Sequence, residues 1–302
     1  MIITLGAVSV SGQEPEPVRI GVLRGPTAVA FGPLIEDSSV LADGRTVEIV
    51  VFPSPSAMIP RLIDGDLDGA TLPANVAAQL YNRGIDLEVA ATFIWGVLYL
   101  IGPDEATGLD HLIGTRVHSP GRGATPDLIL RFLLEHAGLK DRIEVAYGFA
   151  QVELSQLLIA GRVAAAVLPE PFVTLVLRQN TSLHVVADLQ SEWEAATGSG
   201  LPQTVLVLDS EAGVSSELTR LLAESVEEIH SDPEAAAGTV ERLQIGLDAQ
   251  TAIDAIPRLN LRVESAAASR DALITYFEIL HEFDPGSVGG SVPSDPFFGD
   301  AR

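Results

Sequence analysis

Short apolar runs alternate with amphipathic stretches along most of the chain. The clearest example is a phrase that occurs twice, LIDGDLDGATLP at residues 62–73 and LIAGRVAAAVLP at residues 158–169, with six of the twelve positions identical. In each copy, apolar residues at helical spacing lead to a glycine and then to a short apolar run that ends in proline. This pattern predicts the end of a helix followed by a short buried strand.

The repeat continues on both sides at the same offset. Upstream, TVEIVVFPSPS (46–56) aligns with RIEVAYGFAQ (142–151), and downstream DLEVAATF (86–93) aligns with SLHVVADL (182–189). Each copy therefore predicts a strand, a loop, a helix, a short strand, a proline-marked loop, a helix and a strand.

A first strand also has a counterpart in each copy. VRIGVLRGPTAVAFGPLI (18–35) and GTRVHSPGRGATPDLILRFLLEHAGL (114–139) both contain an apolar strand, a glycine turn and a helix. Such alternation predicts two α/β units with parallel sheets covered by helices. Loops at the carboxyl ends of parallel strands gather at one edge, so two facing units form a cleft. The loops LPAN (72–75) and LPEP (168–171) would lie on its opposing lips.

The charge balance excludes some partners. The chain has 302 residues, of which 18 are Lys or Arg and 41 are Asp or Glu, so its formal net charge is −23. A field of this sign repels nucleic acid and anionic membrane surfaces, and neither is expected as a partner. No cysteine is present, which excludes disulfides, thiolate metal sites and cysteine nucleophiles.

Other reaction chemistry has little support in the sequence. The segment GRGATPD (121–127) lacks the glycine-lysine-hydroxyl ending of a triphosphate-binding loop. We therefore expect no catalytic residue, no metal site and no cofactor. The histidines lack metal-ligand spacing and are interpreted as structural; they are His111, His118, His136, His184, His230 and His281.

Three segments resemble one family of binding proteins. MIPRLIDGDLDGATLP (58–73), LIGTRVHSPGRGATPDLILRFLLEHAGL (112–139) and ELSQLLIAGRVAAAVLPEPF (153–172) are similar to solute-binding proteins of ABC importers with the type II periplasmic-binding fold. The most similar class takes up alkanesulfonates, nitrate, taurine, riboflavin or thiamine-pyrimidine precursors. The resemblance implies an α/β protein of two lobes, each a mainly parallel sheet flanked by helices, with the ligand cleft between the lobes.

The same resemblance implies that the chain crosses between the lobes twice. The first crossing is expected after WGVLYLIG (95–102) and the second before PQTVLVLD (202–209). The expected division is residues 18–102 with 203–302 as a discontinuous lobe one, and residues 103–202 as lobe two. Helices at 215–233 and 269–285 should complete lobe one, each beginning at a serine cap and ending at Asp-Pro.

The N-terminal segment has features of a targeting sequence. MIITLGAVSVSGQEPEP (1–17) has a short apolar run, small residues and then a polar stretch, as at the end of a secretory signal peptide. No basic residue precedes the apolar run. Residues 1–17 are therefore expected to be a signal-peptide remnant whose start lies upstream, or a disordered N-terminus. With the resemblance, this predicts an exported, periplasmic, monomeric protein whose partners are a small-molecule solute and an ABC permease.

Candidate ligand-binding residues lie where the predicted strands meet the cleft. Hydroxyls and glycines can leave backbone N–H groups free for an acceptor, and aromatic rings offer flat apolar surfaces. The candidates are Arg24, Thr27, Ser54, Ser56, Asn75 and Trp95 in lobe one, and Ser119, Arg122, Thr125, Tyr147 and Glu170 in lobe two, with Gly25, Gly121, Gly123 and Gln151 beside them.

Several of these residues have a second interpretation. The loop at 119–127 could hold an anion at a helix N-terminus, or form an ordinary turn with Thr125 as the N-cap. The Glu170 carboxylate could accept hydrogen bonds from a ligand amino group or ring nitrogen, or be a solvated or helix N-terminal acid. Trp95 could be a ligand platform or a core residue, and Arg24 a ligand clamp or an interlobe or surface partner.

The favoured function is extracytoplasmic solute binding for an ABC importer. Two lobes would close on a small organic solute, with a preference for an aromatic nitrogen heterocycle of the thiamine-pyrimidine or flavin type. One alternative is binding of a sulfonate or another oxyanion by the same fold. Another is an enzyme of the same fold, of the menaquinone-pathway type.

Overall fold

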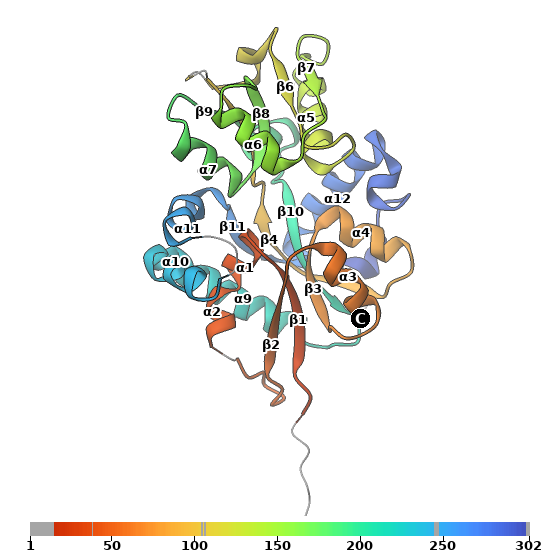
Figure 1. Cartoon of the computed structure of the whole chain (residues 1–302). Coiled ribbons are helices and arrows are strands. Elements are labelled where there is room, and N and C mark those ends of the chain that lie inside the picture. The colour runs from red at the N-terminus through yellow and green to blue at the C-terminus, as the bar shows by residue number, and fades with distance from the viewer. Residues whose placement is uncertain (1–14, 38, 104, 106, 245–247, 300–302) are drawn as a thin grey trace, which may run out of the picture.

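The computed structural model describes residues 15–37, 39–103, 105, 107–244 and 248–299. Two lobes lie one above the other, each with a central sheet and helices on its faces (Figure 1). The predicted two-lobed α/β fold is confirmed. The proposed leader at 1–17 falls mostly on residues 1–14, outside the described part.

Lobe one is built on a six-stranded sheet. Its strands are β1 (Val18–Leu23), β2 (Val47–Phe52), β3 (Gly69–Pro73), β4 (Leu87–Trp95), β10 (Pro202–Asp209) and β11 (Leu261–Ser265). They lie in the order β11-β4-β10-β3-β1-β2. The pairs of β1 with β2 and β3 are parallel, whereas β10 and β11 run antiparallel to their neighbours.

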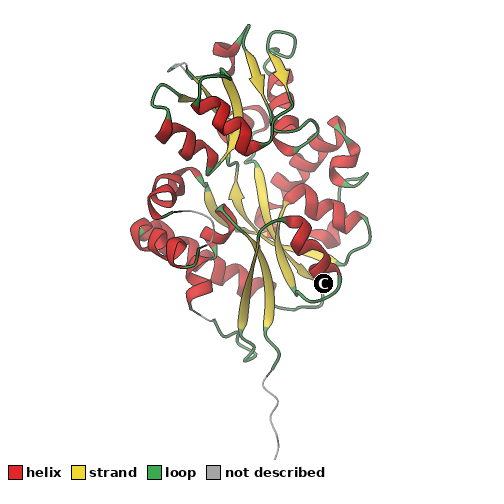
Figure 2. Ribbon diagram, viewed as in Figure 1, coloured by secondary structure: helices red, strands yellow, loops and turns green. Residues whose placement is uncertain are grey.

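Helices cover both faces of this sheet (Figure 2). They are α1 (Pro26–Ala30), α2 (Gly32–Glu36), α3 (Pro55–Ile63), α4 (Ala74–Asn82), α9 (Ser215–Ser231), α10 (Pro233–Arg242), α11 (Ala249–Ala255) and α12 (Ala266–Phe283), with 3-10 turns η2 (Ile256–Arg258), η3 (Pro285–Val288) and η4 (Asp295–Phe298). Successive residues of β10 point to opposite faces of the sheet, because side chains alternate along a strand. Val205 and Val207 join the core under α4 and α12, whereas Leu206 and Leu208 join the core under α1 and α9.

Lobe two repeats this plan on a smaller scale. Its strands are β5 (Leu98–Gly102), β6 (Arg116–His118), β7 (Glu144–Ala146), β8 (Ala165–Pro169) and β9 (His184–Asp188). Its helices are α5 (Thr125–His136), α6 (Gln151–Ile159), α7 (Phe172–Gln179) and α8 (Leu189–Thr197), with the turn η1 (Leu109–Leu112). The order β7-β6-β8-β5-β9 matches β2-β1-β3-β10-β4 of lobe one position by position. The doubled phrase in the sequence therefore marks equivalent helix-strand units, α3–β3 and α6–β8.

The first lobe boundary differs from the expectation. Residues 98–102 were assigned to lobe one, but β5 hydrogen-bonds with β8 and β9 of lobe two. The chain crosses at Gly96, which has a φ of 56°, in the left-handed region that favours glycine. The return crossing ends at Pro202, which already pairs with Trp95 in lobe one.

Both sheets are mixed rather than mainly parallel. Each sheet receives one strand from a chain segment that has just crossed from the other lobe, and this strand runs opposite to its neighbours. In lobe two this strand is β5, antiparallel to β8 and β9; in lobe one it is β10.

Helices α9 and α12 both end as predicted, but the predicted N-cap is wrong for each of them. Helix α12 begins earlier than residue 269, at the cap Ser265, whose hydroxyl accepts from the Ala268 N–H at 3.3 Å. Ser269 instead lies buried inside the helix, where it accepts a hydrogen bond from Thr92 of β4 at 2.9 Å. Helix α9 is preceded by Val214, so its predicted serine cap is wrong. Both helices stop before an Asp-Pro pair.

The lobes pack on each other along two sides. On one side α7 of lobe two lies against α11 of lobe one (Figure 1). On the other, α5 packs on α12, and the ring of Trp193 in α8 lies 6.0 Å from that of Tyr276 in α12. Within the described residues, no helix is long and apolar enough to cross a membrane.

Candidate functional site

A cavity of about 340 Å³ lies between the lobes. Its walls come from the carboxyl ends of β1, β3 and β8, from the N-termini of α1, α5 and α6, and from both crossings. Pro73 and Pro169, the last residues of the doubled phrase, lie in its opposing walls. The lining residues are Leu23, Arg24, Pro26, Thr27, Pro73, Ile94, Val97, Leu98, Ala124, Thr125, Pro126, Gln151, Pro169, Gln203 and Thr204.

Arg24 is the charged group among these lining residues. It follows β1, and its backbone N–H donates to the Phe52 carbonyl at 2.9 Å, which fixes the turn into α1. Gly25 makes the turn with a φ of 88°. The Arg24 side chain is exposed to the cavity, and no described carboxylate forms an ion pair with it. It is therefore available to a ligand anion.

The remaining polar lining groups are uncharged. The buried Thr27 hydroxyl donates to the Leu23 carbonyl, so it is already satisfied. The Gln203 side-chain oxygen accepts from the Val97 N–H at 3.0 Å and ties the two crossings together. Gln151 begins α6 and lies in the lobe-two wall. The cavity is thus mostly apolar, with a few polar groups and one cation, as in many small-molecule sites.

Asn75 and Thr125 meet across the lobes. The Thr125 hydroxyl lies 3.5 Å from the Asn75 side-chain oxygen, at the limit for a hydrogen bond. Thr125 is not the helix cap that the sequence suggested, because α5 begins at Thr125 itself and Ala124 precedes it. Asn75 donates to the Ser287 carbonyl at 3.4 Å and does not line the cavity.

Glu170 lies outside the cavity wall. Its side chain is fully buried and accepts hydrogen bonds from the Thr174 N–H at 3.2 Å and the Thr174 hydroxyl at 3.0 Å. It also forms an ion pair with Arg258 of lobe one. The carboxylate is the helix N-terminal acid of the second interpretation, but buried and paired rather than solvated.

Trp95 is a core residue in the structure. Its indole N–H donates to the Arg262 carbonyl at 2.8 Å, and the Arg262 guanidinium lies 4.4 Å from the ring centroid. The ring is 3% exposed and is absent from the cavity wall. The platform role proposed for Trp95 therefore has no geometric support.

Arg122 and Tyr147 lie beside a separate cavity of about 210 Å³ in lobe two. The Arg122 guanidinium lies 4.4 Å from the Tyr147 ring centroid. The Tyr147 hydroxyl donates to the buried Asp127 carboxylate at 2.6 Å, and the Gly123 N–H donates to the same carboxylate at 2.7 Å. Asp127 thus holds the loop 119–124 from within the lobe, and Arg122 and Tyr147 support the cleft loop from behind.

This arrangement predicts that the Tyr147 phenol ionises only at high pH. Burial, and then the hydrogen bond to Asp127, raise the pKa of Tyr147 to about 12. An unfolded tyrosine ionises near about pH 10, so the stability that this phenol contributes is present below that pH and is lost as the pH rises towards 12. Ultraviolet titration of the wild type and of Tyr147→Phe measures this pKa, because the difference between the two curves is the tyrosinate signal of Tyr147. We expect the difference to appear only as the pH approaches 12. A difference that appears at about pH 10, the value for a free tyrosine, would contradict the buried hydrogen bond.

The candidate serines do not line the cavity. The Ser54 and Ser56 hydroxyls lie 2.9 Å apart and bond with each other. Ser119 is 1% exposed, and its hydroxyl has no partner among the described residues. Of the eleven candidates, the cavity brings together Arg24, Thr27 and Thr125, with the neighbouring Gln151.

The sequence missed the residues contributed by the crossings. Val97, Leu98, Gln203 and Thr204 line the cavity because both connecting segments pass its floor. The predicted crossings could have identified these residues, because any segment that joins two facing lobes must pass the cleft between them.

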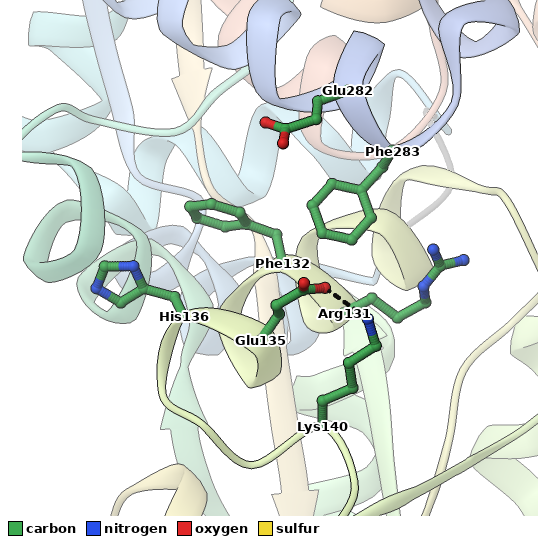
Figure 3. A pocket seen from close by; sticks show the side chains of 7 residues that line it. All are labelled: Arg131, Phe132, Glu135, His136, Lys140, Glu282 and Phe283. Atoms are coloured by element: carbon green, nitrogen blue, oxygen red, sulfur yellow. Dashed lines mark hydrogen bonds and ion pairs between the residues drawn. The ribbon is translucent and has the colours of Figure 1, made fainter.

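A groove of about 460 Å³ lies elsewhere, between α5 and the end of α12. Figure 3 shows Phe132 and Phe283 in its wall and the ion pair of Glu135 with Lys140, 2.9 Å apart, at its rim. The Arg131 guanidinium lies 5.4 Å from the Phe283 ring centroid. The groove follows the outer lobe contact, lacks residues of the cleft loops and is not the candidate site. Across the described residues, no group of three or more His, Cys, Asp or Glu side chains could hold a metal ion.

Comparison with known proteins identifies two kinds of relatives. A family model described as menaquinone biosynthesis matches residues 29–282. No curated protein sequence matches the chain. The solved structure of an ABC transporter protein from Parabacteroides distasonis is 29% identical, with a TM-score of 0.83 over 95% of this chain and 99% of that chain.

Two more distant structures share the fold. The periplasmic aliphatic sulphonate binding protein SsuA from Escherichia coli is 16% identical, with a TM-score of 0.71 over 92% of this chain and 90% of that chain. A putative nitrate transport protein from Thermoplasma volcanium is 14% identical, with a TM-score of 0.59 over 89% and 94%. The two-lobed architecture is thus the periplasmic-binding fold of ABC-transporter solute-binding proteins, as the sequence resemblance implied.

Proposed function

The chain belongs to the family whose model is described as menaquinone biosynthesis and has the periplasmic-binding fold, and we propose that it binds a small organic solute between its lobes for an ABC importer. The observation that carries this proposal is the interlobe cavity, walled by both lobes and both crossings. A solute that contacts both walls favours the closed arrangement by its differential affinity.

The chemistry of the wall supports binding more than catalysis. General acid–base catalysis needs a titratable side chain within hydrogen-bond reach of the reacting atom. The described lining residues include Arg24 but no Asp, Glu, His, Lys or Tyr. Such a wall can hold and orient a solute, and it offers few groups for proton transfer.

The favoured solute is a compact, largely apolar molecule with one anionic group. Arg24 would pair with a sulfonate or carboxylate, since its planar guanidinium matches such oxygens in a bidentate geometry. The prolines and aliphatic side chains would contact the apolar part. The E. coli structure of the same fold is a sulphonate-binding protein, which supports this choice.

The preference for a thiamine-pyrimidine or flavin heterocycle loses its main support. It depended on Glu170, Trp95 and Tyr147, and the polar groups of all three bond to the protein itself. The oxyanion alternative is therefore the better proposal. An ABC permease, a periplasmic location and a monomeric state complete the proposal, in keeping with the relatives' ABC-transporter descriptions.

A second candidate is an enzyme of menaquinone biosynthesis, favoured by the family match over residues 29–282. The two candidates differ in the fate of the bound molecule. A thermal-shift screen of alkanesulfonates, taurine, nitrate, aromatic carboxylates, riboflavin and thiamine-pyrimidine precursors should identify a stabilising solute. At about 100 times its dissociation constant, the solute adds about 2.7 kcal/mol to the free energy of unfolding. Recovery of the solute unchanged by mass spectrometry supports binding, whereas its conversion supports the enzyme.

Replacing Arg24 tests the proposed anion contact. Arg24→Gln should weaken binding of an anionic solute by about 10- to 100-fold, because a charge-assisted hydrogen bond contributes about 1.5–3 kcal/mol. Arg162→Gln is a matched control, since Arg162 is exposed and lies outside the cavity. Calorimetry should show normal affinity for the control. Equal affinities for both variants would exclude Arg24 as the anion partner.

A further inference from the structure

Two polar stripes face each other across the α7 side of the lobe contact. On lobe two, Glu170, Thr174 and Arg178 are spaced four residues apart, so they lie on one side of α7 and of the two residues that precede it. On lobe one, the facing residues lie along α11, its N-cap and η2, three or four positions apart. We call the seven residues the α7–η2 clasp: Glu170, Thr174 and Arg178 with Asp248, Thr251, Asp254 and Arg258.

The inner end of the clasp is buried. The Arg258 Nε donates to Glu170, and its second terminal nitrogen donates to the Thr174 hydroxyl at 2.6 Å and to the Asp254 carbonyl at 2.9 Å. The Glu170 side chain is fully buried and that of Arg258 is 30% exposed. A carboxylate in such a place needs its partner, because an unpaired buried charge is strongly unfavourable.

The outer end of the clasp is exposed, and Arg178 forms all of its interactions between the lobes. Arg178 donates to the Thr251 hydroxyl at 3.0 Å and lies 3.6 Å from Asp254 and 3.8 Å from Asp248. Exposed pairs of this kind are weak and are screened by salt. Most of the interlobe free energy in the clasp should therefore come from Arg258.

The clasp is connected directly to the floor of the cavity. The Glu170 N–H donates to the carbonyl of Val97, a lining residue, at 2.9 Å, and Glu170 directly follows Pro169 in the opposite wall. The Tyr99 hydroxyl donates to the Arg258 carbonyl at 2.9 Å. Asn260, two residues after Arg258, donates to the Gly96 carbonyl at 2.7 Å. Arg258 thus fixes lobe two to lobe one at the crossing itself.

We propose that Arg258 is a positioning residue that sets the angle between the lobes, and through it the solute affinity, without touching the solute. The link to affinity rests on the proposed binding function. Arg258 is outside the cavity wall, so its effect would act through Pro169 and Val97. If the lobes adopt the binding-competent angle only part of the time, the apparent dissociation constant rises in inverse proportion to that fraction.

The absence of cysteine allows the lobe angle to be measured directly. Ile63→Cys on α3 and Gln156→Cys on α6 place two spin labels on exposed positions of different lobes. Distance distributions by pulsed electron resonance are compared, without solute, for this labelled parent, for Arg258→Lys and for Arg258→Met with Glu170→Gln. Both Arg258 variants should broaden or shift the distribution, and calorimetry with the screened solute should show affinity at least about tenfold weaker, with faster release.

The outer end gives a second test that does not depend on the buried pair. Arg178→Glu places a like charge beside Asp254 and should shift the distribution further at low salt than at high salt. Adding Asp254→Arg reverses this pair and should restore most of the parent distribution, although Asp248 remains as a like charge beside position 178. If these two residues affected the lobe angle through packing and not through their charges, reversing both charges would give no such rescue.

The outcomes separate this proposal from the proposed function. Unchanged distributions in both Arg258 variants overturn the positioning role, whether or not a solute binds. A shifted distribution with unchanged solute affinity overturns the link to affinity. A shifted distribution in a protein that binds none of the screened solutes supports the role of Arg258 in the lobe angle and contradicts the proposed binding function alone.

Discussion

Replacing Arg258 by alanine is expected to lower the free energy of unfolding by about 3 kcal/mol. The substitution removes the cation from Glu170, whose side chain is fully buried, and leaves a charge with no ionic partner. Breaking a buried pair in this way typically costs about 3–5 kcal/mol, and the 30% exposure of Arg258 places the expected value at the lower end. Urea denaturation followed by circular dichroism measures the change.

Two further variants test that explanation. Arg258→Met combined with Glu170→Gln removes both charges and should recover most of the lost stability, because no buried charge remains. Arg242→Ala breaks the exposed pair of Arg242 with Glu36, whose side chains are 62% and 34% exposed, and should change stability by less than about 1 kcal/mol. Similar losses for Arg242→Ala and Arg258→Ala would show that burial of Glu170 is not the cause.

Trp193→Ala should destabilise the protein by about 3–5 kcal/mol, the range for truncating a large buried aromatic residue. Trp193 is fully buried in α8, with its ring 4.9 Å from that of Phe132 in α5 and 6.0 Å from that of Tyr276 in α12. The truncation therefore removes packing within lobe two and between the lobes. Thermal and urea denaturation should both show the loss.

Trp193→Phe separates packing from hydrogen bonding. The indole nitrogen has no hydrogen-bond partner among the described residues, so phenylalanine loses ring volume but no polar contact. We expect a loss of about 1–2 kcal/mol, smaller than for Trp193→Ala, because a phenyl ring still fills most of the space of the indole and the cost of a cavity grows with its volume. A loss for Trp193→Phe as large as for Trp193→Ala would indicate an essential role for the indole N–H.

The sequence predicted the architecture well because its main signals are local. Helix spacing, a glycine stop and an apolar run are read within a dozen residues, and α3–β3 and α6–β8 follow them. The boundary at 102 was wrong because WGVLYLIG is apolar throughout, and such a run fits the continuation of β4 as well as a new strand. The reversal at Gly96 depends on pairing with β8, about seventy residues later.

The site was less predictable, because side-chain partners are set by the tertiary fold. Glu170 follows a cleft strand, but its carboxylate meets Arg258, which is 88 positions away in the sequence. Trp95 and Tyr147 also lie at strand ends, but the indole N–H bonds to the Arg262 carbonyl and the phenol to the Asp127 carboxylate. Arg24 does line the cavity, because the turn after β1 begins at the adjacent Gly25, but its contact with a ligand stays a prediction.

The position of β10 has a consequence for synthesis on the ribosome. This strand lies between β3 and β4 at the centre of the lobe-one sheet, yet it is made only after β5 to β9 of lobe two. Until residue 209 emerges, β3 and β4 have open hydrogen-bonding edges, whereas lobe two is already complete in sequence. We therefore expect the second lobe to fold first, with the first lobe closing around β10 afterwards. During that interval the open edges of β3 and β4 are the part of the nascent chain most exposed to mispairing.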